Sequence, residues 1–343
     1  MTRKPTIADL ANATGLGAAT VDRVLNARPN VSARARQRVT EAARQLGYPL
    51  PQHLEDDQRD MRPDLSLGFV LHKKSQHFYQ RFAQQIEAAC AARPDARITC
   101  SIRFSASQSP EDFAREIRTL ADGCQAIAAT GVNHASLTNL SAELAARHIP
   151  LFSLLNDFTG STGRGYFGLD NLKAGRTAGW MMATRLQHSA KVAVFVGGTR
   201  WHGQAMRETG FRSYLREYAP AIHVLDTAIN LETRQLTYEA TLDLLTRVPD
   251  LDGLYVAGGG MEGAIAALRE MRPSDKVTLI VNELTPESQR GLSDRYVTMV
   301  IATPLDQLCS PLLDRMTGAI LRPDEPERGA PGLDQQIYLP ESF

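Results

Sequence analysis

The stretch TIADLANATGLGAATVDRVLN, residues 6–26, contains two short helical patterns separated by glycines. Thr6 and Asp9 have the spacing of a capping box, and apolar residues then recur every three or four positions, which predicts a short helix. Gly15 suits the tight turn that must follow, because glycine accepts a positive φ without steric cost. A second short helix is predicted from about Ala18 to Leu25.

A third helical pattern follows at once. Ser32 is a favourable N-cap for it, Gly47 ends it, and Pro49 and Pro51 prevent its continuation. Two short helices joined by a glycine turn and braced by a third are typical of a helix-turn-helix unit, whose second helix enters the major groove of DNA. The alternative is an ordinary three-helix cap with no role in nucleic-acid binding.

The charge of this head differs from that of the rest of the chain. Residues 1–50 carry eight lysines and arginines and three acidic residues, a net charge of +5, although the whole chain has a net charge of zero. A basic segment of this kind fits a polyanionic partner, or it is simply a solvated face. Together with the helix-turn-helix pattern, the charge favours DNA.

Residues 6–48, from TIADLANATGLGAATVDRVLN to VSARARQRVTEAARQLGY, resemble the N-terminal domain of the LacI/GalR (lac-repressor) family of bacterial transcription regulators. The resemblance implies that the start of the second helix, at Ala18, Ala19 and Arg23, lies against base edges. Arg23 is suited to a bidentate contact with guanine, and the two alanines to apolar contact with thymine methyl groups. The positions that hold phosphates in the family are Thr6, Thr20, Asn26 and Ser32.

Two departures from the family pattern lie near the DNA. Gly17 replaces the serine that usually caps the second helix. Residues 51–64, PQHLEDDQRDMRPD, replace the usual hinge helix, in which a leucine wedges into the minor groove. Leu54 is the only candidate wedge here, and nearby acidic residues would face phosphates in a groove: Glu55, Asp56, Asp57 and Asp60. We therefore expect a solvated, flexible linker, with an atypical hinge as the alternative.

From residue 65 onward, apolar runs alternate with helical periodicity. The predicted strands lie at 65–71, 97–104, 126–131, 150–155, 191–197, 222–230, 251–258, 277–283 and 297–303. Helical patterns fill 78–92, 111–122, 138–148 and 239–248. Nearly continuous apolar strands that alternate with helices favour parallel sheets covered on both faces. Roughly ten strands fit two doubly wound lobes better than one sheet.

Residues 65–325 resemble the periplasmic sugar-binding-protein fold that the same family uses as its effector domain, notably in FGLDNLKAGRTAGWMMATRL (167–186) and AMRETGFRSYLRE (205–217). The prediction is thus an α/β chain with a three-helix DNA-binding domain (1–50), a linker (51–64) and a two-lobed effector-binding domain (65–343) with doubly wound parallel sheets. Lobe 1 is expected at about 65–169 and 303–325, and lobe 2 at about 170–302. The ligand then lies between lobes that close about hinges.

The candidate ligand-binding residues lie in loops that follow strands. Phe78 and Tyr79 can stack on a sugar ring, or they begin a core stripe. Arg207 matches a family arginine that reaches the effector and is otherwise a surface residue. Asn156 and Asp157 offer hydrogen bonds to hydroxyls, or they are plain turn residues. The complete candidate set is Gln76, Phe78, Tyr79, Asn156, Asp157, Trp201, His202, Arg207 and Glu283.

An enzyme is the competing hypothesis. GGGMEG, residues 258–263, satisfies G-x-G-x-x-G after a predicted strand, and Glu283 follows about twenty residues later, which is the outline of a nicotinamide-dinucleotide site. A lone match is weak, however, because glycine at a strand-to-helix turn is common without any phosphate. The sequence has no GK[ST] loop, HExxH, GxSxG or clustered Cys/His set, so we expect neither catalysis nor a cofactor or metal.

The sequence as a whole predicts a regulator that acts in the cytoplasm. No apolar run reaches the length of a membrane span, no signal peptide is expected, and the four cysteines form no CxxC pair. We expect a repressor that binds a pseudo-palindromic double-stranded DNA operator as a homodimer and senses a small sugar, polyol or related metabolite. Its effector and operator sequence are not encoded in any motif.

Overall fold

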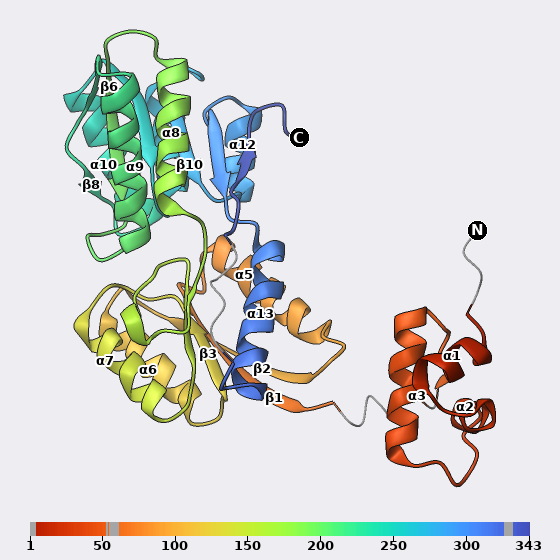
Figure 1. Ribbon diagram of the computed structural model, residues 1–343. Coiled ribbons are helices and arrows are strands. Elements are labelled where there is room, and N and C mark those ends of the chain that lie inside the picture. The colour runs from red at the N-terminus through yellow and green to blue at the C-terminus, as the bar shows by residue number, and fades with distance from the viewer. Residues whose placement is uncertain (1–4, 53, 55–61, 326–331) are drawn as a thin grey trace. The chain divides into compact units, whose positions relative to one another are not determined.

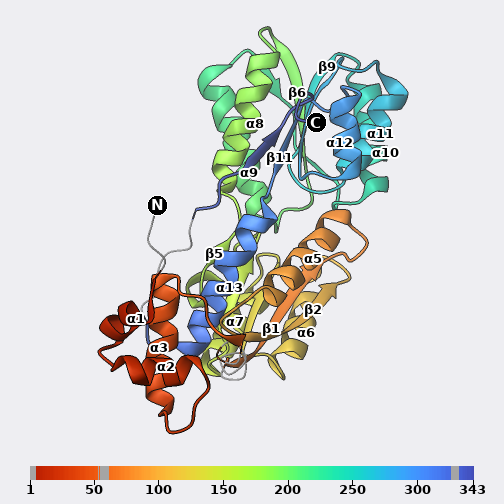
Figure 2. The ribbon, with the colours of Figure 1, turned by 90° about the vertical axis from the view of Figure 1, so that its right-hand side faces the viewer.

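The computed structural model describes residues 5–52, 54, 62–325 and 332–343. The chain separates into two compact units. The first comprises residues 1–64 with residues 94–97, and the second comprises residues 65–93 and 98–343. Figures 1 and 2 show the helical first unit and the α/β second unit, which are described separately below.

The first unit contains α1 (Ile7–Thr14), α2 (Ala18–Leu25) and α3 (Ala33–Leu46). The predicted capping box is present at α1, where the side chain of Thr6 accepts from the Asp9 amide and the Asp9 carboxylate accepts from the Thr6 amide. Gly15 adopts a φ of 63°, as the turn between α1 and α2 requires. The predicted caps of α3 are also confirmed, because Ser32 accepts from the Ala35 amide at 3.2 Å and Gly47 has a φ of 68°.

The core of this unit is apolar and involves all three helices. Leu10, Val21 and Val39 are completely buried, with Val24 and Ala43 beside them. The N-cap of α2 makes no side-chain hydrogen bond, as expected from a glycine at that position. The stripe that packs inward fixes the opposite side of α2 as its solvent-facing side.

Leu54 corrects the prediction for the linker. The sequence suggests a solvated segment or a minor-groove wedge, but Leu54 is 2% exposed and belongs to the apolar core of the first unit. The reason is hydrophobic burial, because Leu54 joins the apolar cluster that α1, α2 and α3 form. The expectations for Glu55, Asp56, Asp57 and Asp60 concern positions outside the described residues.

The second unit contains two sheets. The sheet of lobe 1 has the order β2-β1-β3-β4-β5, and β1, β3, β4 and β5 pair in parallel. Its strands are β1 (Asp64–His72), β2 (Arg97–Ser105), β3 (Ala126–Ala129), β4 (Leu151–Leu154) and β5 (Tyr166–Phe167). Its helices are α5 (His77–Ala91), α6 (Pro110–Ala121), α7 (Ala135–Ala146), the short 3₁₀ helix η1 (Gly160–Thr162) and α13 (Leu305–Leu321).

Alternating residues of β1 and β3 pack into two separate cores. Phe69 and Ala128 face α5 and α13, whereas Val70 and Ile127 face α6 and α7. Successive residues of a strand point to opposite faces, so an apolar run of this kind requires helices on both. Figure 2 shows α13, from the C-terminal part of the chain, beside α5.

The sheet of lobe 2 has the order β12-β11-β10-β9-β6-β7, with β8 also paired to β6. Helices α8 and α9 cover one face, and α10, α11 and α12 cover the other. Its strands are β6 (Ala190–Val196), β7 (Ile222–Val224), β8 (Ala228–Ile229), β9 (Leu251–Val256), β10 (Thr278–Asn282), β11 (Met299–Ala302) and β12 (Gln336–Tyr338). Its helices are α8 (Asn171–Arg185), α9 (His202–Tyr218), α10 (Arg234–Arg247), α11 (Met261–Met271) and α12 (Pro286–Ser293).

The chain crosses between the lobes three times. It enters lobe 2 between β5 and α8, returns to lobe 1 between β11 and α13, and then contributes β12 to the sheet of lobe 2. The sequence does not predict this last crossing. Strand β12 is three residues long and pairs antiparallel with β11, so it departs from the otherwise parallel pattern at the edge of the sheet. Within the described ranges, no helix has the length and apolarity needed to cross a bilayer.

Leu54→Ala is expected to destabilise the first unit by about 2–5 kcal/mol, because it leaves a cavity in a small core. Hydrogen exchange of the amides of α1 to α3 in the whole chain measures the effect. Leu46→Ala is the matched control, since Leu46 is 40% exposed. Equal exchange rates for the two variants would show that Leu54 does not stabilise this unit.

Candidate functional site

A cavity of about 90 Å³ lies between the two lobes, where strands of both sheets end. Lobe 1 contributes the start of α5 and the residues that follow β3 and β4. Lobe 2 contributes the loops after β6, β8, β9 and β10. In open α/β sheets ligands bind at the carboxyl ends of the strands, so two such edges facing each other form a natural ligand site.

The structure brings seven of the nine candidate residues to this cavity: Gln76, Phe78, Tyr79, Asn156, Trp201, Arg207 and Glu283. Two candidates, Asp157 and His202, lie outside its lining. Asp157 is exposed and its carboxylate accepts from the Ser153 hydroxyl at 3.2 Å, because the chain turns outward after Asn156. His202 is exposed at the first position of α9, where its neighbour Trp201 takes the inward direction.

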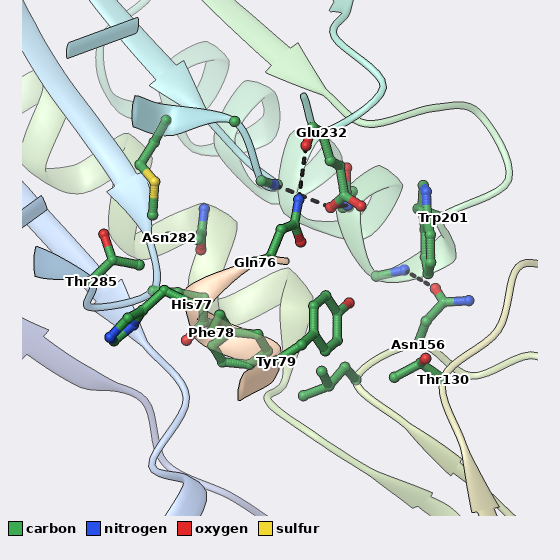
Figure 3. Close-up of a pocket in the computed structure, with 18 of the residues that line it drawn as sticks. Gln76, His77, Phe78, Tyr79, Thr130, Asn156, Trp201, Glu232, Asn282 and Thr285 are labelled. Carbon is green, nitrogen blue, oxygen red and sulfur yellow. Dashed lines mark hydrogen bonds between the residues drawn. The ribbon is translucent and has the colours of Figure 1, made fainter. Parts of the chain in front are cut away.

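Phe78 and Tyr79 form an aromatic wall at the start of α5 (Figure 3). Their ring centroids are 5.2 Å apart at an angle of 75°. Tyr79 also belongs to the apolar core with Phe82 and Ile86, and burial raises the pKa of its phenol well above the usual value. The pair therefore begins a core stripe and also lines the cavity, so both interpretations of the sequence describe its position.

Trp201 joins the two lobes. It precedes α9 in lobe 2, yet it is 4% exposed and packs in the apolar cluster of lobe 1, with its ring centroid 6.2 Å from that of Phe113. Its indole Nε1 is buried and has no hydrogen-bond partner among the described residues. A buried donor without a partner costs about 1–3 kcal/mol.

Two acceptors in the lining have the same property. Glu232 uses Oε1 to accept from the Gln204 amide at 2.7 Å and from Gly259 N at 3.1 Å, while its Oε2 is buried without a hydrogen bond in the part of the chain that is described. Asn282, the last residue of β10, donates through Nδ2 to Val256 O at 3.0 Å, and its Oδ1 is likewise unpaired. Residues of the lining thus hold a buried N–H donor, two buried acceptor oxygens and a buried ring nitrogen of His77 that have no partner in the described part of the chain.

His72 lies behind this part of the lining, at the end of β1. Its Nε2 is 3.9 Å from Glu232 Oε2, too far for a hydrogen bond, and its ring contacts those of Trp201 and Phe113. Burial, with a smaller contribution from Lys73, lowers the pKa of His72 to about 3. The imidazole is therefore neutral near pH 7.

Arg207 and Glu283 are held in fixed positions. Arg207 is 9% exposed, and its Nε and Nη1 donate to Asn171 Oδ1 at 2.7 Å and Ala257 O at 2.9 Å. The carboxylate of Glu283 accepts from the amide and the hydroxyl of Thr303 at 2.9 and 2.7 Å. Burial raises the pKa of Glu283, and the nearby Arg207 opposes that shift. Thr303 lies between β11 and α13, on the segment by which the chain returns to lobe 1. Its hydrogen bonds therefore connect Glu283 in the cavity lining to that interlobe segment.

The DNA-binding candidates lie on the accessible side of the first unit. Ala18, Ala19 and Arg23 are exposed on α2, and the Arg23 side chain makes no hydrogen bond or ion pair within the described residues. Thr20 is half-buried. Asn26 is exposed, and its amide nitrogen donates to the Asp22 carboxylate at 2.8 Å. The exposed Thr6 and Ser32 cap α1 and α3.

Sequence-family models match both units. Residues 6–50 match bacterial regulatory proteins of the lacI family, and residues 67–308 match the periplasmic binding protein domain. Residues 6–50 are therefore a regulatory domain of the lacI type. The second unit of the chain belongs to the family of periplasmic binding protein domains, as the resemblance of residues 65–325 predicts.

Two curated relatives are also HTH-type transcriptional regulators by name. The chain is 26% identical to HTH-type transcriptional regulator DegA of Bacillus subtilis. The match covers 67% of the chain and 66% of DegA. The chain is also 26% identical to an uncharacterized HTH-type transcriptional regulator of Streptomyces limosus over 62% of its length and 58% of the relative. The matches thus span slightly less than two thirds of these relatives.

Solved structures share the fold of the second unit. One is a solute-binding protein of Burkholderia graminis that was solved with D-arabinose. The match covers 81% of the present chain and 96% of the solute-binding protein, with a TM-score of 0.74 and 19% identity. GanP, a glucose-galactose binding protein of Geobacillus stearothermophilus, matches 81% and 99%, with a TM-score of 0.72 and 18% identity. At this identity the likeness concerns the fold alone.

The glycine run at residues 258–260 has a structural explanation that requires no bound dinucleotide. A Cβ on Gly258 would lie 2.5 Å from Gln204 Oε1, and one on Gly260 would lie 2.2 Å from Thr237 Oγ1. Gly260 also has a φ of 90°, which side chains rarely adopt. In a dinucleotide-binding loop the glycines make room for pyrophosphate, whereas here the chain's own side chains fill that room. The motif therefore does not support the oxidoreductase hypothesis.

The sequence analysis missed several residues that line the cavity between the lobes, above all Glu232, Asn282 and Gln204. Asn282 could have been found, because it directly precedes Glu283 at the end of a predicted strand. Glu232 could not, because it reaches the cavity through a left-handed turn at Leu231 and Glu232 for which the sequence Leu-Glu gives no signal.

His72 is expected to make the free energy of unfolding of the chain depend on pH. Its folded pKa of about 3 lies below the ordinary 6.5, so the unfolded chain binds the proton first. Its contribution is complete above pH 6.5 and falls as the pH drops toward 3, by about 1.4 kcal/mol per pH unit. Comparing urea unfolding of the wild type and His72→Gln at pH 7.5 and 5.5 measures this slope. An equal loss of stability in both proteins would contradict the assignment.

Proposed function

We propose that this chain is a ligand-responsive, DNA-binding transcription repressor that acts in the bacterial cytoplasm. Residues 1–50 bind the operator, and residues 65–343 bind the effector. Residues 51–64 are the linker that connects these two domains. Lobe 1 comprises about 65–169 and 303–325, and lobe 2 comprises about 170–302 together with β12. The lacI-family match over residues 6–50 and the regulator names of the two relatives support this assignment.

The proposed DNA contact is made by α2. Arg23 binds a guanine edge, Ala18 and Ala19 contact thymine methyl groups, and the phosphate contacts come from Thr6, Thr20, Asn26 and Ser32. The exposure of Ala18, Ala19 and Arg23 and the absence of a competing partner for the Arg23 side chain in the described residues support this assignment. One such module buries too little surface for tight specific binding, so two copies bind a pseudo-palindromic operator as a homodimer.

The proposed effector is a small sugar or polyol. The observation that carries this proposal is a set of buried polar atoms without partners in residues that line the cavity, three of them in lobe 2: Trp201 Nε1, Glu232 Oε2 and Asn282 Oδ1. A hydroxyl group both donates and accepts, so a molecule with several hydroxyls satisfies all three, while its apolar ring face packs on Phe78 and Tyr79. A cavity of about 90 Å³ is too small for an oligosaccharide. The sugars named for the two structural neighbours are consistent with this class.

The effector alters DNA affinity by favouring one arrangement of the lobes. A ligand that binds both arrangements equally shifts nothing, however tightly it binds. The lining of this cavity comes from both lobes, so a molecule that binds Glu232 and Asn282 of lobe 2 and packs on Phe78 and Tyr79 of lobe 1 prefers the arrangement in which the lobes are together. This preference is the free energy available for regulation.

Arg23→Ala is expected to reduce operator affinity about 5- to 100-fold, because a bidentate guanine contact contributes about 1–3 kcal/mol. Operators selected from a random library with the wild-type chain provide the probe, and fluorescence anisotropy provides the measurement. Arg44→Ala, which changes an exposed arginine in the last turn of α3, is the control and retains the preference. Full sequence preference in the Arg23 variant would refute the placement of the reading helix.

Trp201→Phe is expected to weaken effector binding about 10-fold, because the ring is retained and one hydrogen bond to the ligand is lost. The ligand is the metabolite identified by mass spectrometry in the purified chain, and titration calorimetry measures its affinity. Trp180→Phe is the matched control, since Trp180 is 48% exposed and lies outside the cavity. An unchanged affinity in the Trp201 variant would exclude the indole from the site.

A further inference from the structure

The turn between β8 and α10 has an unusual backbone. Leu231 and Glu232 have φ angles of 49° and 53°, in the left-handed region that residues with a Cβ rarely adopt. A residue with a Cβ is strained in this region because its Cβ lies too close to the following carbonyl oxygen. Conformations of this kind persist only where the surroundings fix them, and they cluster at ligand sites and moving elements. From within lobe 2, Asn230 supports the turn by accepting from the Glu232 amide at 2.9 Å.

The backbone carbonyls of this turn are bound by lobe 1. The ammonium group of Lys73 donates to Leu231 O at 2.7 Å, and the Gln108 side-chain amide donates to the same oxygen at 3.2 Å. The Gln76 side-chain amide donates to Glu232 O at 2.9 Å, as Figure 3 shows. Three side chains from the loops of one lobe thus converge on two consecutive carbonyls of the other.

The side chain of the same turn lies in the cavity. Glu232 Oε1 is held by Gly259 N and by Gln204, both in lobe 2, while Oε2 is buried and unpaired. A Cβ on Gly259 would lie 3.1 Å from the Glu232 side chain, so glycine allows the close approach. One residue therefore contacts lobe 1 through its backbone and the ligand cavity through its carboxylate.

We propose that the Leu231–Glu232 turn is the latch that couples the cavity to lobe closure, an inference that rests on the proposed function. A hydroxyl that donates to Glu232 Oε2 removes the cost of burying that oxygen unpaired. It thereby stabilises the left-handed turn that presents both carbonyls to Lys73, Gln76 and Gln108. Without that donor, the strained turn and the unpaired oxygen both favour separation of the lobes.

Trp201 provides an internal reporter of closure. The chain has two tryptophans, and Trp180→Phe leaves Trp201 as the only one. Because Trp201 belongs to lobe 2 and packs in the core cluster of lobe 1, separation of the lobes exposes its ring. Quenching of its fluorescence by acrylamide therefore measures the open fraction without any ligand or DNA.

The test compares latch variants of the full chain in the Trp180→Phe background. Lys73→Met with Gln108→Leu removes the donors to Leu231 O and leaves the cavity lining intact. This double variant is expected to raise the acrylamide quenching constant at least threefold, because it removes side chains by which lobe 1 holds the turn. Lys74→Met, an exposed neighbour of Lys73, is the control and leaves the constant unchanged.

Circular dichroism verifies that each variant is folded, and Gln108→Leu alone, expected to raise the constant to an intermediate value, replaces the double variant if that one does not fold. Unchanged quenching in the folded latch variants overturns the proposal, and so does an equal rise in Lys74→Met. Operator binding is measured separately on the same proteins. A chain that binds no operator but shows the expected quenching keeps the latch and loses the proposed function.

Discussion

A polar atom that is buried without a hydrogen-bond partner costs free energy, and four described residues that line the cavity between the lobes carry such an atom: His77 Nδ1, Trp201 Nε1, Glu232 Oε2 and Asn282 Oδ1. Trp201, Glu232 and Asn282 come from three separate segments of lobe 2, whereas His77 belongs to α5 of lobe 1. At about 1–3 kcal/mol each, they favour any arrangement in which they find partners. Water offers such partners when the lobes separate, and a molecule with several hydroxyls offers them when the lobes are together. This competition connects the content of the cavity to the arrangement of the lobes.

Strained backbone occurs around the same cavity. Half of the ten positive-φ residues other than glycine in the described part of the chain are at its rim or at the contacts that bridge it: Lys73, Leu155, Leu231, Glu232 and Glu283. Parallel strands that end in the cleft require abrupt turns to direct side chains inward, and the left-handed conformation provides them. The glycines at 258–260 have the complementary role, because they admit the side chains of Gln204, Glu232 and Thr237.

Features with local physical causes could be predicted from the sequence. The capping box at Thr6, the turn at Gly15 and the end of α3 at Gly47 each depend on a few neighbouring residues. The alternation of strands and helices follows from apolar periodicity. Three features depend instead on distant contacts. Leu54 packs in a core formed by α1, α2 and α3. Strand β12 is too short for its sequence to predict a strand. Glu232 reaches the cavity through a left-handed turn that neither Leu nor Glu favours.

A crystal structure of the full chain with its co-purified effector tests the central claim most directly. The account predicts one small polyhydroxylated molecule in the cavity, with its oxygens within about 2.5–3.2 Å of Trp201 Nε1, Glu232 Oε2 and Asn282 Oδ1. A ligand bound elsewhere would contradict the account. A ligand in the cavity that leaves these three atoms without hydrogen bonds would contradict it equally.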